Sequence, residues 1–198
     1  MEHALSEESR AILDTARAFG RDRIAPHARA WEAAGSVPRS LWADAAALGF
    51  GGLFVAADRG GAGLSRLDGT LVFEGLAMAC PSVSAWLSIH NMIAGMLDRH
   101  GGAAAQARLP PLCTMQTFGA YALTEPGSGS DAAALRTAAR PAGDGWRLTG
   151  AKAFISGAGY ADLYVVMARS GGSGAAGISA FLVEAGAAGL SFGAPEDK

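Results

Sequence analysis

The chain has 198 residues, half of them hydrophobic, and a formal net charge of -2 at pH 7. Such a chain can bury one large core or two small ones, which is typical of soluble globular proteins. Its 16 Lys and Arg residues are scattered rather than clustered, so we expect no nucleic-acid partner.

The cysteines, histidines and hydrophobic runs bear on compartment and metal binding. Cys80 and Cys113 are too few for a disulfide framework, so we expect two core residues in a reducing compartment. His90 and His100 lack paired-ligand spacing, so we expect no metal site. Residues 1 to 4 show no signal-peptide pattern, and no apolar run approaches the roughly 20 residues of a membrane span. We therefore expect no membrane association and a cytoplasmic location, or the mitochondrial matrix in a eukaryote.

The first 117 residues carry helix signals one after another. Apolar residues at helical spacing predict helices, and Ser6, Pro38 and Pro81 mark helix starts. The predicted helices cover residues 6 to 33 (limited or bent by Pro26), 38 to 47, 66 to 79, 81 to 100 and 103 to 115. A short extended link is predicted over residues 51 to 55. We therefore expect an N-terminal helical domain over residues 1 to 117.

Short runs with β character follow, separated by Gly, Pro and Asp. The predicted strands cover residues 118 to 123, 132 to 139, 145 to 156, 163 to 168 and 178 to 183. Strands without helices between them predict an antiparallel β-barrel or sandwich. The fold class is thus α+β, with a β domain over residues 118 to 198.

The segment from Tyr121 to Asp131, which we call motif 1, combines small, hydroxyl and charged residues. Pro126 fixes φ and favours an extended Glu125, and two glycines allow a tight turn. The backbone N-H groups of motif 1 can then face a ligand rich in oxygen atoms, together with the hydroxyls of Thr124, Ser128 and Ser130. Taken alone, such a Gly/Ser turn is also typical of a plain surface loop.

Motif 1 and residues Lys152 to Gly157, which we call motif 2, together resemble the acyl-CoA dehydrogenase family. These flavoenzymes place a double bond between Cα and Cβ of an acyl-CoA thioester. Residues 60 to 68, 88 to 92 and 111 to 115 resemble the branch of that family that acts on isobutyryl-CoA. The resemblance covers about residues 5 to 193. It implies a helical domain, then a β domain of which residues 118 to 198 are an incomplete part, then a C-terminal four-helix domain that is missing from this chain.

The resemblance implies FAD as the cofactor and assigns contacts to matching positions. The implied FAD contacts are Tyr121, Ala122, Leu123, Thr124, Gly127, Ser128, Gly129, Ser130, Phe154, Ile155 and Ser156. Phe154 and Ser156 stand where the family usually has Trp and Thr, and the isobutyryl-CoA branch uses the same pair as this chain. The implied substrate contacts are Ser130, Ser88 and Asn91, with His90 at the base of the acyl pocket. The family's catalytic Glu base belongs beyond Lys198, so no catalytic residue is assigned.

The implied activity is desaturation of a short branched-chain acyl-CoA. Isobutyryl-CoA, converted to methacrylyl-CoA in valine breakdown, is the leading substrate, with 2-methylbutyryl-, isovaleryl- and butyryl-CoA as alternatives. The implied partners are an electron-transferring flavoprotein and sister subunits of a homotetramer. Two other classes stay open: a flavin-dependent monooxygenase or oxidase on the same scaffold, and a noncatalytic module for acyl-CoA binding or subunit association. Without the base, the 198-residue piece alone is expected to be inactive.

Overall fold

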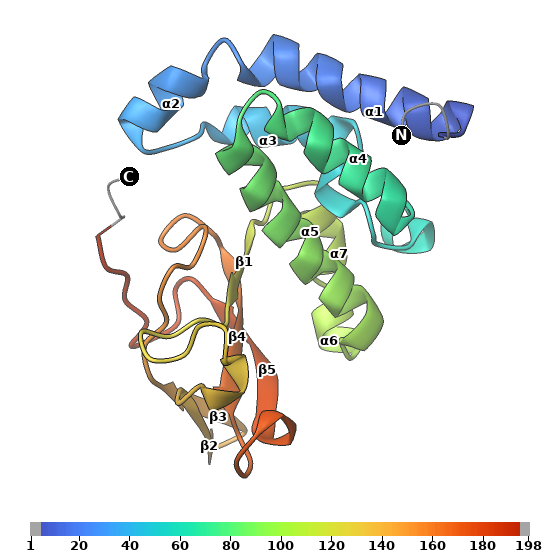
Figure 1. Ribbon diagram of the computed structural model, residues 1–198. Coiled ribbons are helices and arrows are strands. Elements are labelled where there is room, and N and C mark those ends of the chain that lie inside the picture. Colours follow the sequence, from blue (N-terminus) through green and yellow to red (C-terminus); the bar gives the residue numbers. More distant parts are fainter. Residues whose placement is uncertain (1–4, 195–198) are drawn as a thin grey trace. The chain divides into compact units, whose positions relative to one another are not determined.

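A computed structural model describes residues 5 to 194 of the chain (Figure 1). The chain divides into two compact units, the first running through Thr117 and the second beginning at Phe118. Residues 1 to 4, on which the expectation about a signal peptide rests, and the last four residues of the expected β domain lie outside the described residues.

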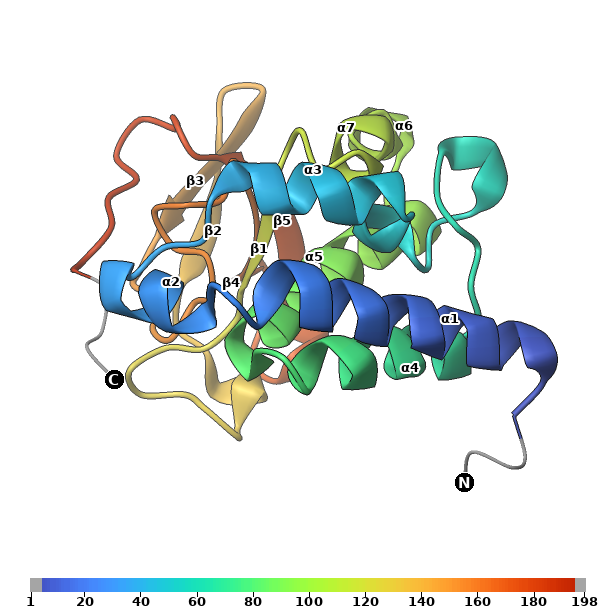
Figure 2. The same cartoon turned by 90° about the horizontal axis from the view of Figure 1, so that it is seen from above.

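The first unit is helical, as the sequence predicts. Its elements are α1 (Glu7–Phe19), the π-helical turn η2 (Gly20–Ile24), α2 (Ala28–Ala34), α3 (Arg39–Ala47), the 3-10 turns η3 (Phe50–Gly52) and η4 (Ala57–Arg59), α4 (Arg66–Ala77), α5 (Pro81–His100), α6 (Ala103–Gln106) and α7 (Leu109–Cys113). Helix α4 packs against both α1 and α5 (Figure 2). None of the described helices is long and apolar enough to cross a membrane.

Serine caps fix the starts of α1 and α4. The hydroxyl of Ser6 accepts the N-H of Ser9, and the hydroxyl of Ser65 accepts the N-H of Asp68. Ser9 Oγ also donates to Asp68 Oδ1 at 2.7 Å, which joins the two helix starts. The core between the helices is apolar and includes Leu13, Ile24, Leu53, Leu76, Leu87 and Ile93.

Three predictions in this unit need correction. The helix predicted over residues 6 to 33 is interrupted at residues 25 to 27, because Pro26 lacks an N-H donor. The helix predicted over residues 103 to 115 is split into α6 and α7, and two prolines lie in the first turn of α7. The link at residues 51 to 55 is not extended. A Cβ on Gly51 would lie 2.3 Å from the Cys113 carbonyl oxygen, so the glycine allows a compact turn against α7.

The two cysteines differ in burial. Cys113 is a core residue, as predicted, and burial raises the pKa of its thiol. Cys80 lies at the start of α5 and is only half-buried, so the prediction of a core residue was wrong there.

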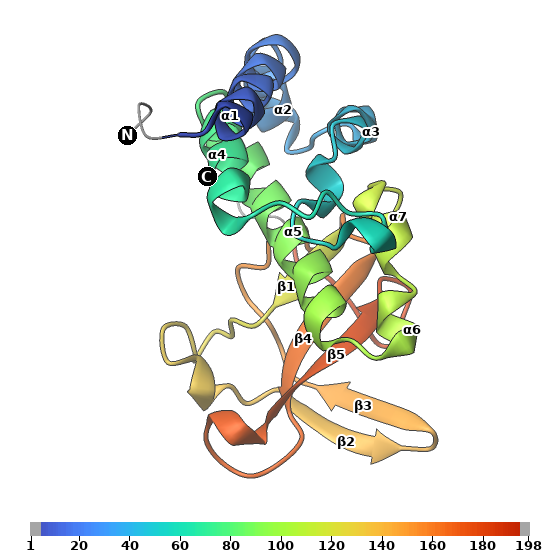
Figure 3. The ribbon, with the colours of Figure 1, turned by 90° about the vertical axis from the view of Figure 1, so that its right-hand side faces the viewer.

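The second unit contains one mixed sheet. Its elements are β1 (Gly119–Ala122), the 3-10 turn η5 (Ala132–Ala134), β2 (Ala138–Ala142), β3 (Gly145–Thr149), β4 (Leu163–Arg169), the 3-10 turn η6 (Ala175–Gly177) and β5 (Ile178–Glu184). Strand β4 pairs with β5 in antiparallel register along its whole length. Figure 3 shows these two strands side by side and the β2–β3 hairpin near one end of β4.

The β domain follows the helical domain as predicted, but its sheet is not purely antiparallel. Strand β1 pairs with β4 in parallel from Gly119 opposite Leu163 to Ala122 opposite Val166, and β2 pairs with β4 in parallel at Arg169. Parallel neighbours need a long crossover connection. Residues 123 to 162 provide it for β1 and β4, and this crossover contains motif 2 and all of motif 1 except Tyr121 and Ala122, which lie in β1.

Candidate functional site

Motif 1 leaves β1 and turns back on itself. Glu125 N-H donates to the Ser128 carbonyl at 3.0 Å, and Ser128 N-H donates to the Glu125 carbonyl at 3.1 Å. Pro126 and Gly127 occupy the centre of this turn. Ser128 Oγ donates to the Asp131 carbonyl at 2.7 Å, and the residue is buried. Both donors of Ser128 therefore stabilise the turn, which corrects the expectation that its hydroxyl faces a ligand.

Other donors of the two motifs are unpaired. The backbone N-H groups of Gly127, Gly129, Ser130, Ile155 and Ser156 have no partner among residues 5 to 194. Neither Gly127 nor Gly129 has a positive φ, and a Cβ on either would meet no atom within 4 Å. Neither the turn nor the packing therefore requires a glycine at these two positions. They leave the backbone open to a ligand that accepts hydrogen bonds.

Motif 2 lies directly beside motif 1. Ala153 N-H donates to the Thr124 carbonyl at 2.9 Å. The next residue, Phe154, has φ of 56° and a side chain that is 74% exposed. A left-handed backbone costs an aromatic residue roughly 1–2 kcal/mol, and such strain concentrates at functional sites. Phe154 therefore presents an aromatic ring to solvent from a strained position.

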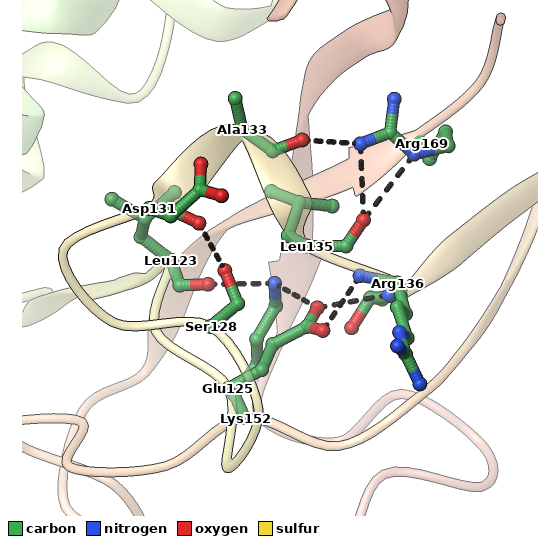
Figure 4. A network of polar contacts seen from close by, with 10 residues as sticks. Leu123, Glu125, Ser128, Asp131, Ala133, Leu135, Arg136, Lys152 and Arg169 are labelled. Carbon is green, nitrogen blue, oxygen red and sulfur yellow. Dashed lines mark hydrogen bonds and ion pairs between the residues drawn. The ribbon is translucent and has the colours of Figure 1, made fainter. Parts of the chain in front are cut away.

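A buried ion pair connects the two motifs (Figure 4). Lys152 Nζ lies 2.8 Å from Glu125 Oε1 and donates to the Leu123 carbonyl, also at 2.8 Å. The Lys152 side chain is only 11% exposed and the Glu125 side chain only 7%. The ammonium group thus binds two acceptors of motif 1, one directly after β1 and one two residues further along the chain.

The Glu125 carboxylate also holds the segment before β2. It accepts the N-H of Arg136 at 2.6 Å on Oε2 and the N-H of Thr137 at 2.8 Å on Oε1. Burial alone would raise the pKa of Glu125, but the hydrogen bonds from Lys152 and these two N-H groups outweigh it and lower the pKa to about 2. Glu125 is therefore ionised throughout the physiological pH range.

Arg169 holds the other side of the same segment. Its Nη2 donates to the carbonyls of Ala133 at 2.7 Å and Leu135 at 3.1 Å (Figure 4). These contacts explain why the strand predicted over residues 132 to 139 is replaced by η5 and a later start of β2. The N-H groups of Arg136 and Thr137 bond to the Glu125 carboxylate, and the carbonyls of Ala133 and Leu135 bond to the Arg169 guanidinium, instead of to a neighbouring strand.

Tyr164 holds the turn that follows motif 2. Its buried hydroxyl accepts the N-H of Gly159 at 3.0 Å and donates to the Gly157 carbonyl at 3.2 Å. Burial raises the pKa of this phenol, so it stays neutral and keeps its donor. Motif 2 is thus fixed on both sides, by Lys152 before Phe154 and by Tyr164 after Ser156.

The residues expected to contact substrate from the helical unit lie on α5. Asn91 is fully buried, accepts the N-H of Leu53 at 2.7 Å and donates to the carbonyls of Phe50 and Leu87. Its amide serves the fold, which corrects the expected substrate contact. Ser88 is half-buried and donates to the Ala85 carbonyl, so the lone pairs of its hydroxyl oxygen stay available as acceptors.

His90 is also a core residue. Its ring stacks on Trp86, and Nε2 lies 3.0 Å from the Leu112 carbonyl, to which it donates. Burial lowers the pKa of His90 to about 4, so the imidazole is neutral at physiological pH. The side chain joins α5 to α7. Among the described residues, no cluster of three His, Cys, Asp or Glu side chains could hold a metal ion.

Four residues that organise the site were not assigned a role from the sequence: Glu125, Lys152, Tyr164 and Arg169. Glu125 and Lys152 had one available signal. They are the only charged residues within motif 2 and the part of motif 1 before Asp131, and they carry opposite charge.

Comparison with known proteins identifies the family. The model of the acyl-CoA dehydrogenase N-terminal domain matches residues 6–116, and the model of the middle domain matches residues 120–198. The chain belongs to the acyl-CoA dehydrogenase family. The mitochondrial isobutyryl-CoA dehydrogenase of Bos taurus is 52% identical over 195 residues, which cover 98% of this chain and 47% of that protein.

Solved structures of family members share the fold. Butyryl-CoA dehydrogenase from Megasphaera elsdenii superimposes with a TM-score of 0.89 at 32% identity, over 98% of this chain and 52% of that one. The structure described as PigA with FAD and proline gives a TM-score of 0.88 at 32% identity, over 98% and 52%. The chain spans about half the length of the curated relatives it matches.

Proposed function

We propose that this protein is an FAD-dependent acyl-CoA dehydrogenase that acts on a short branched-chain acyl-CoA, with isobutyryl-CoA as the preferred substrate. The observation that carries the proposal is the pairing of motifs 1 and 2 through Ala153 and Thr124, with unpaired N-H donors on both. The 52% identity to an isobutyryl-CoA dehydrogenase supports the choice of substrate.

The residues present suit a flavin. The proposed cofactor contacts are the N-H groups of Gly127, Gly129, Ser130, Ile155 and Ser156, the hydroxyl of Thr124, the ring of Phe154 and the backbone of residues 121 to 123. When bound, FAD supplies the two-electron acceptor for α,β-desaturation. Oriented N-H donors stabilise negative charge at the position where it develops, at no cost of reorganisation during the reaction. A structure of PigA with FAD supports a flavin in this fold.

Substrate contacts are proposed for Ser130 and Ser88 only. Ser130 is exposed and its N-H is unpaired among residues 5 to 194, so it can face an acyl thioester as well as the cofactor. We assign proton abstraction to no residue of this chain. Geometry is the main contribution that the described residues can make, because both reacting carbons must be held near their reaction partners.

A kinetic comparison on the full-length protein tests the proposal. FAD should co-purify or rebind, and kcat/KM should be highest for isobutyryl-CoA with an electron-transferring flavoprotein as oxidant. Discrimination against one extra or missing methylene is about 10–200-fold. A higher kcat/KM for butyryl-CoA would remove the branched-chain assignment, and fast reoxidation of the reduced protein by oxygen would favour an oxidase or monooxygenase.

A further inference from the structure

Motifs 1 and 2 are joined by very few bonds. Within residues 5 to 194, the connections are the Ala153 to Thr124 backbone hydrogen bond and the two bonds of Lys152 Nζ, to Leu123 and Glu125. The backbone bond is a single contact between neutral groups. The Lys152 ammonium is charged, reaches two separate points of the chain and is buried, so it constrains both the distance and the angle between the motifs.

We infer that Lys152 is a positioning residue of the proposed flavin site, which sets the relative orientation of motifs 1 and 2 through Glu125 and Leu123. The inference rests on the proposed function. Lys152 itself donates to acceptors of the chain and is assigned no contact with the cofactor. Its effect on the cofactor passes through the residues on either side of it.

The strained backbone of Phe154 supports this role. Phe154 follows Lys152 by two residues and holds a positive φ although its side chain gains little from burial. Such strain persists only where the surrounding structure over-determines it. On one side the restraint comes from Lys152 and Ala153, because both bind motif 1. Removing the ammonium group frees the backbone before Phe154 to relax and to turn the ring away.

Glu125 makes the restraint rigid. Its carboxylate is bonded to the N-H groups of Arg136 and Thr137 as well as to Lys152. The acceptor that Lys152 binds is therefore itself fixed, and the low exposure of both side chains leaves no room for a competing water shell. A positional error at Phe154 follows directly from the loss of either partner.

The test uses the full-length protein with Lys152→Met, Lys152→Arg and the double variant Glu125→Gln/Lys152→Met. The readouts are the Kd for FAD from fluorescence titration of the apoprotein, the visible circular dichroism of the bound flavin, and the Tm of the apoprotein. We expect Lys152→Met to raise the Kd at least about 10-fold, the scale seen for residues that orient metal ligands, and to change the dichroism. Lys152→Arg should recover most of both.

The double variant separates positioning from stability. It leaves no unpaired buried charge, so its Tm should recover toward the wild-type value while its Kd stays high. The double variant also allows the inference to be tested if the Lys152→Met variant does not fold. The matched control is Arg59→Met in the helical unit, which breaks another 2.8 Å ion pair, to the Asp98 carboxylate that is 8% exposed. It should lower the Tm and leave the Kd unchanged.

Two results would overturn the inference alone: a Lys152→Met variant with wild-type Kd and dichroism, or a double variant whose Kd recovers together with its Tm. Failure of the wild-type protein to bind FAD overturns the proposed function, and the inference with it.

Discussion

The side-chain amide of Asn91 accepts the N-H of Leu53 at 2.7 Å and thereby ties the middle of α5 to the turn after α3. The same amide donates to the Phe50 carbonyl at 2.8 Å, so one N-H and one C=O group of the turn both bond to the Asn91 side chain. The link is fully buried. Because no water can replace it, loss of this contact leaves buried polar groups of the turn without a partner.

Asn91→Ala should therefore lower the free energy of unfolding by about 2–6 kcal/mol, since it leaves a buried N-H and a buried C=O unpaired at roughly 1–3 kcal/mol each. Urea denaturation measures this loss. Ser88→Ala on the same helix is the control, because within residues 5 to 194 its hydroxyl bonds only to the carbonyl of Ala85 in its own helix. It should change stability by less than about 0.5 kcal/mol. Equal stabilities for the two variants would contradict the prediction.

Glu125 should produce an acid-dependent loss of stability. The folded-state pKa is lowered from 4.5 to about 2, so the stabilisation is complete above pH 4.5 and is lost as the pH falls toward 2. At 1.36 kcal/mol per pH unit, the wild-type protein should lose up to about 3 kcal/mol across this window from this group. The Glu125→Gln variant should be less stable than the wild-type protein at pH 7, and its free energy of unfolding should depend less on pH between 4.5 and 2. Unfolding curves at a series of pH values check it, and parallel slopes for both proteins would refute it.

Phe154→Gly should separate stability from flavin binding. Glycine accepts the positive φ of this position, and the exposed ring contributes little packing, so the apoprotein should gain up to about 1 kcal/mol. Phe154→Leu keeps the strain and also loses the ring. Both variants should bind FAD more weakly, but only the glycine variant should be stabilised. Thermal unfolding and FAD titration measure the two effects; a destabilised Phe154→Gly would show that the ring packs on the protein.

Gly150→Ala should destabilise the second unit. A Cβ at this residue would lie 2.4 Å from Thr137 Oγ1 and 2.7 Å from Thr137 Cα, so the backbone must move. Overpacking of this kind costs about 1–3 kcal/mol. Gly145→Ala at the other end of β3 is the control, since its Cβ would meet nothing within 4 Å. A Gly150→Ala protein with the Tm of the control would disprove the close approach.

Elements with local signals were predicted accurately from the sequence. Helix α5 begins at Pro81 and ends at His100 as predicted, because a proline at its first turn and Gly101 after its last mark both ends. Strands β4 and β5 were each predicted to within one residue, since both are continuous apolar or alternating runs between turn residues. The positions of motifs 1 and 2 came from the family resemblance rather than from periodicity.

Features that depend on contacts between distant residues could not be predicted. The segment at residues 132 to 139 has β-type composition, but its backbone bonds to Glu125 and Arg169, and no spacing in the sequence announces such a bond. The parallel pairing of β1 with β4 likewise depends on the path of the crossover. Asn91 was expected to bind substrate because of the family resemblance; only its burial and three hydrogen bonds identify its structural function.

The segment from Ala133 to Thr137 is held in place by a carboxylate and a guanidinium that belong to other parts of the chain. The alanine methyl groups within it carry none of the polar restraints. The position of this segment therefore depends on the side chains of Glu125 and Arg169 more than on its own side chains. Random mutagenesis should find the alanines permissive and those two charges intolerant of replacement, which is the reverse of what the local sequence suggests.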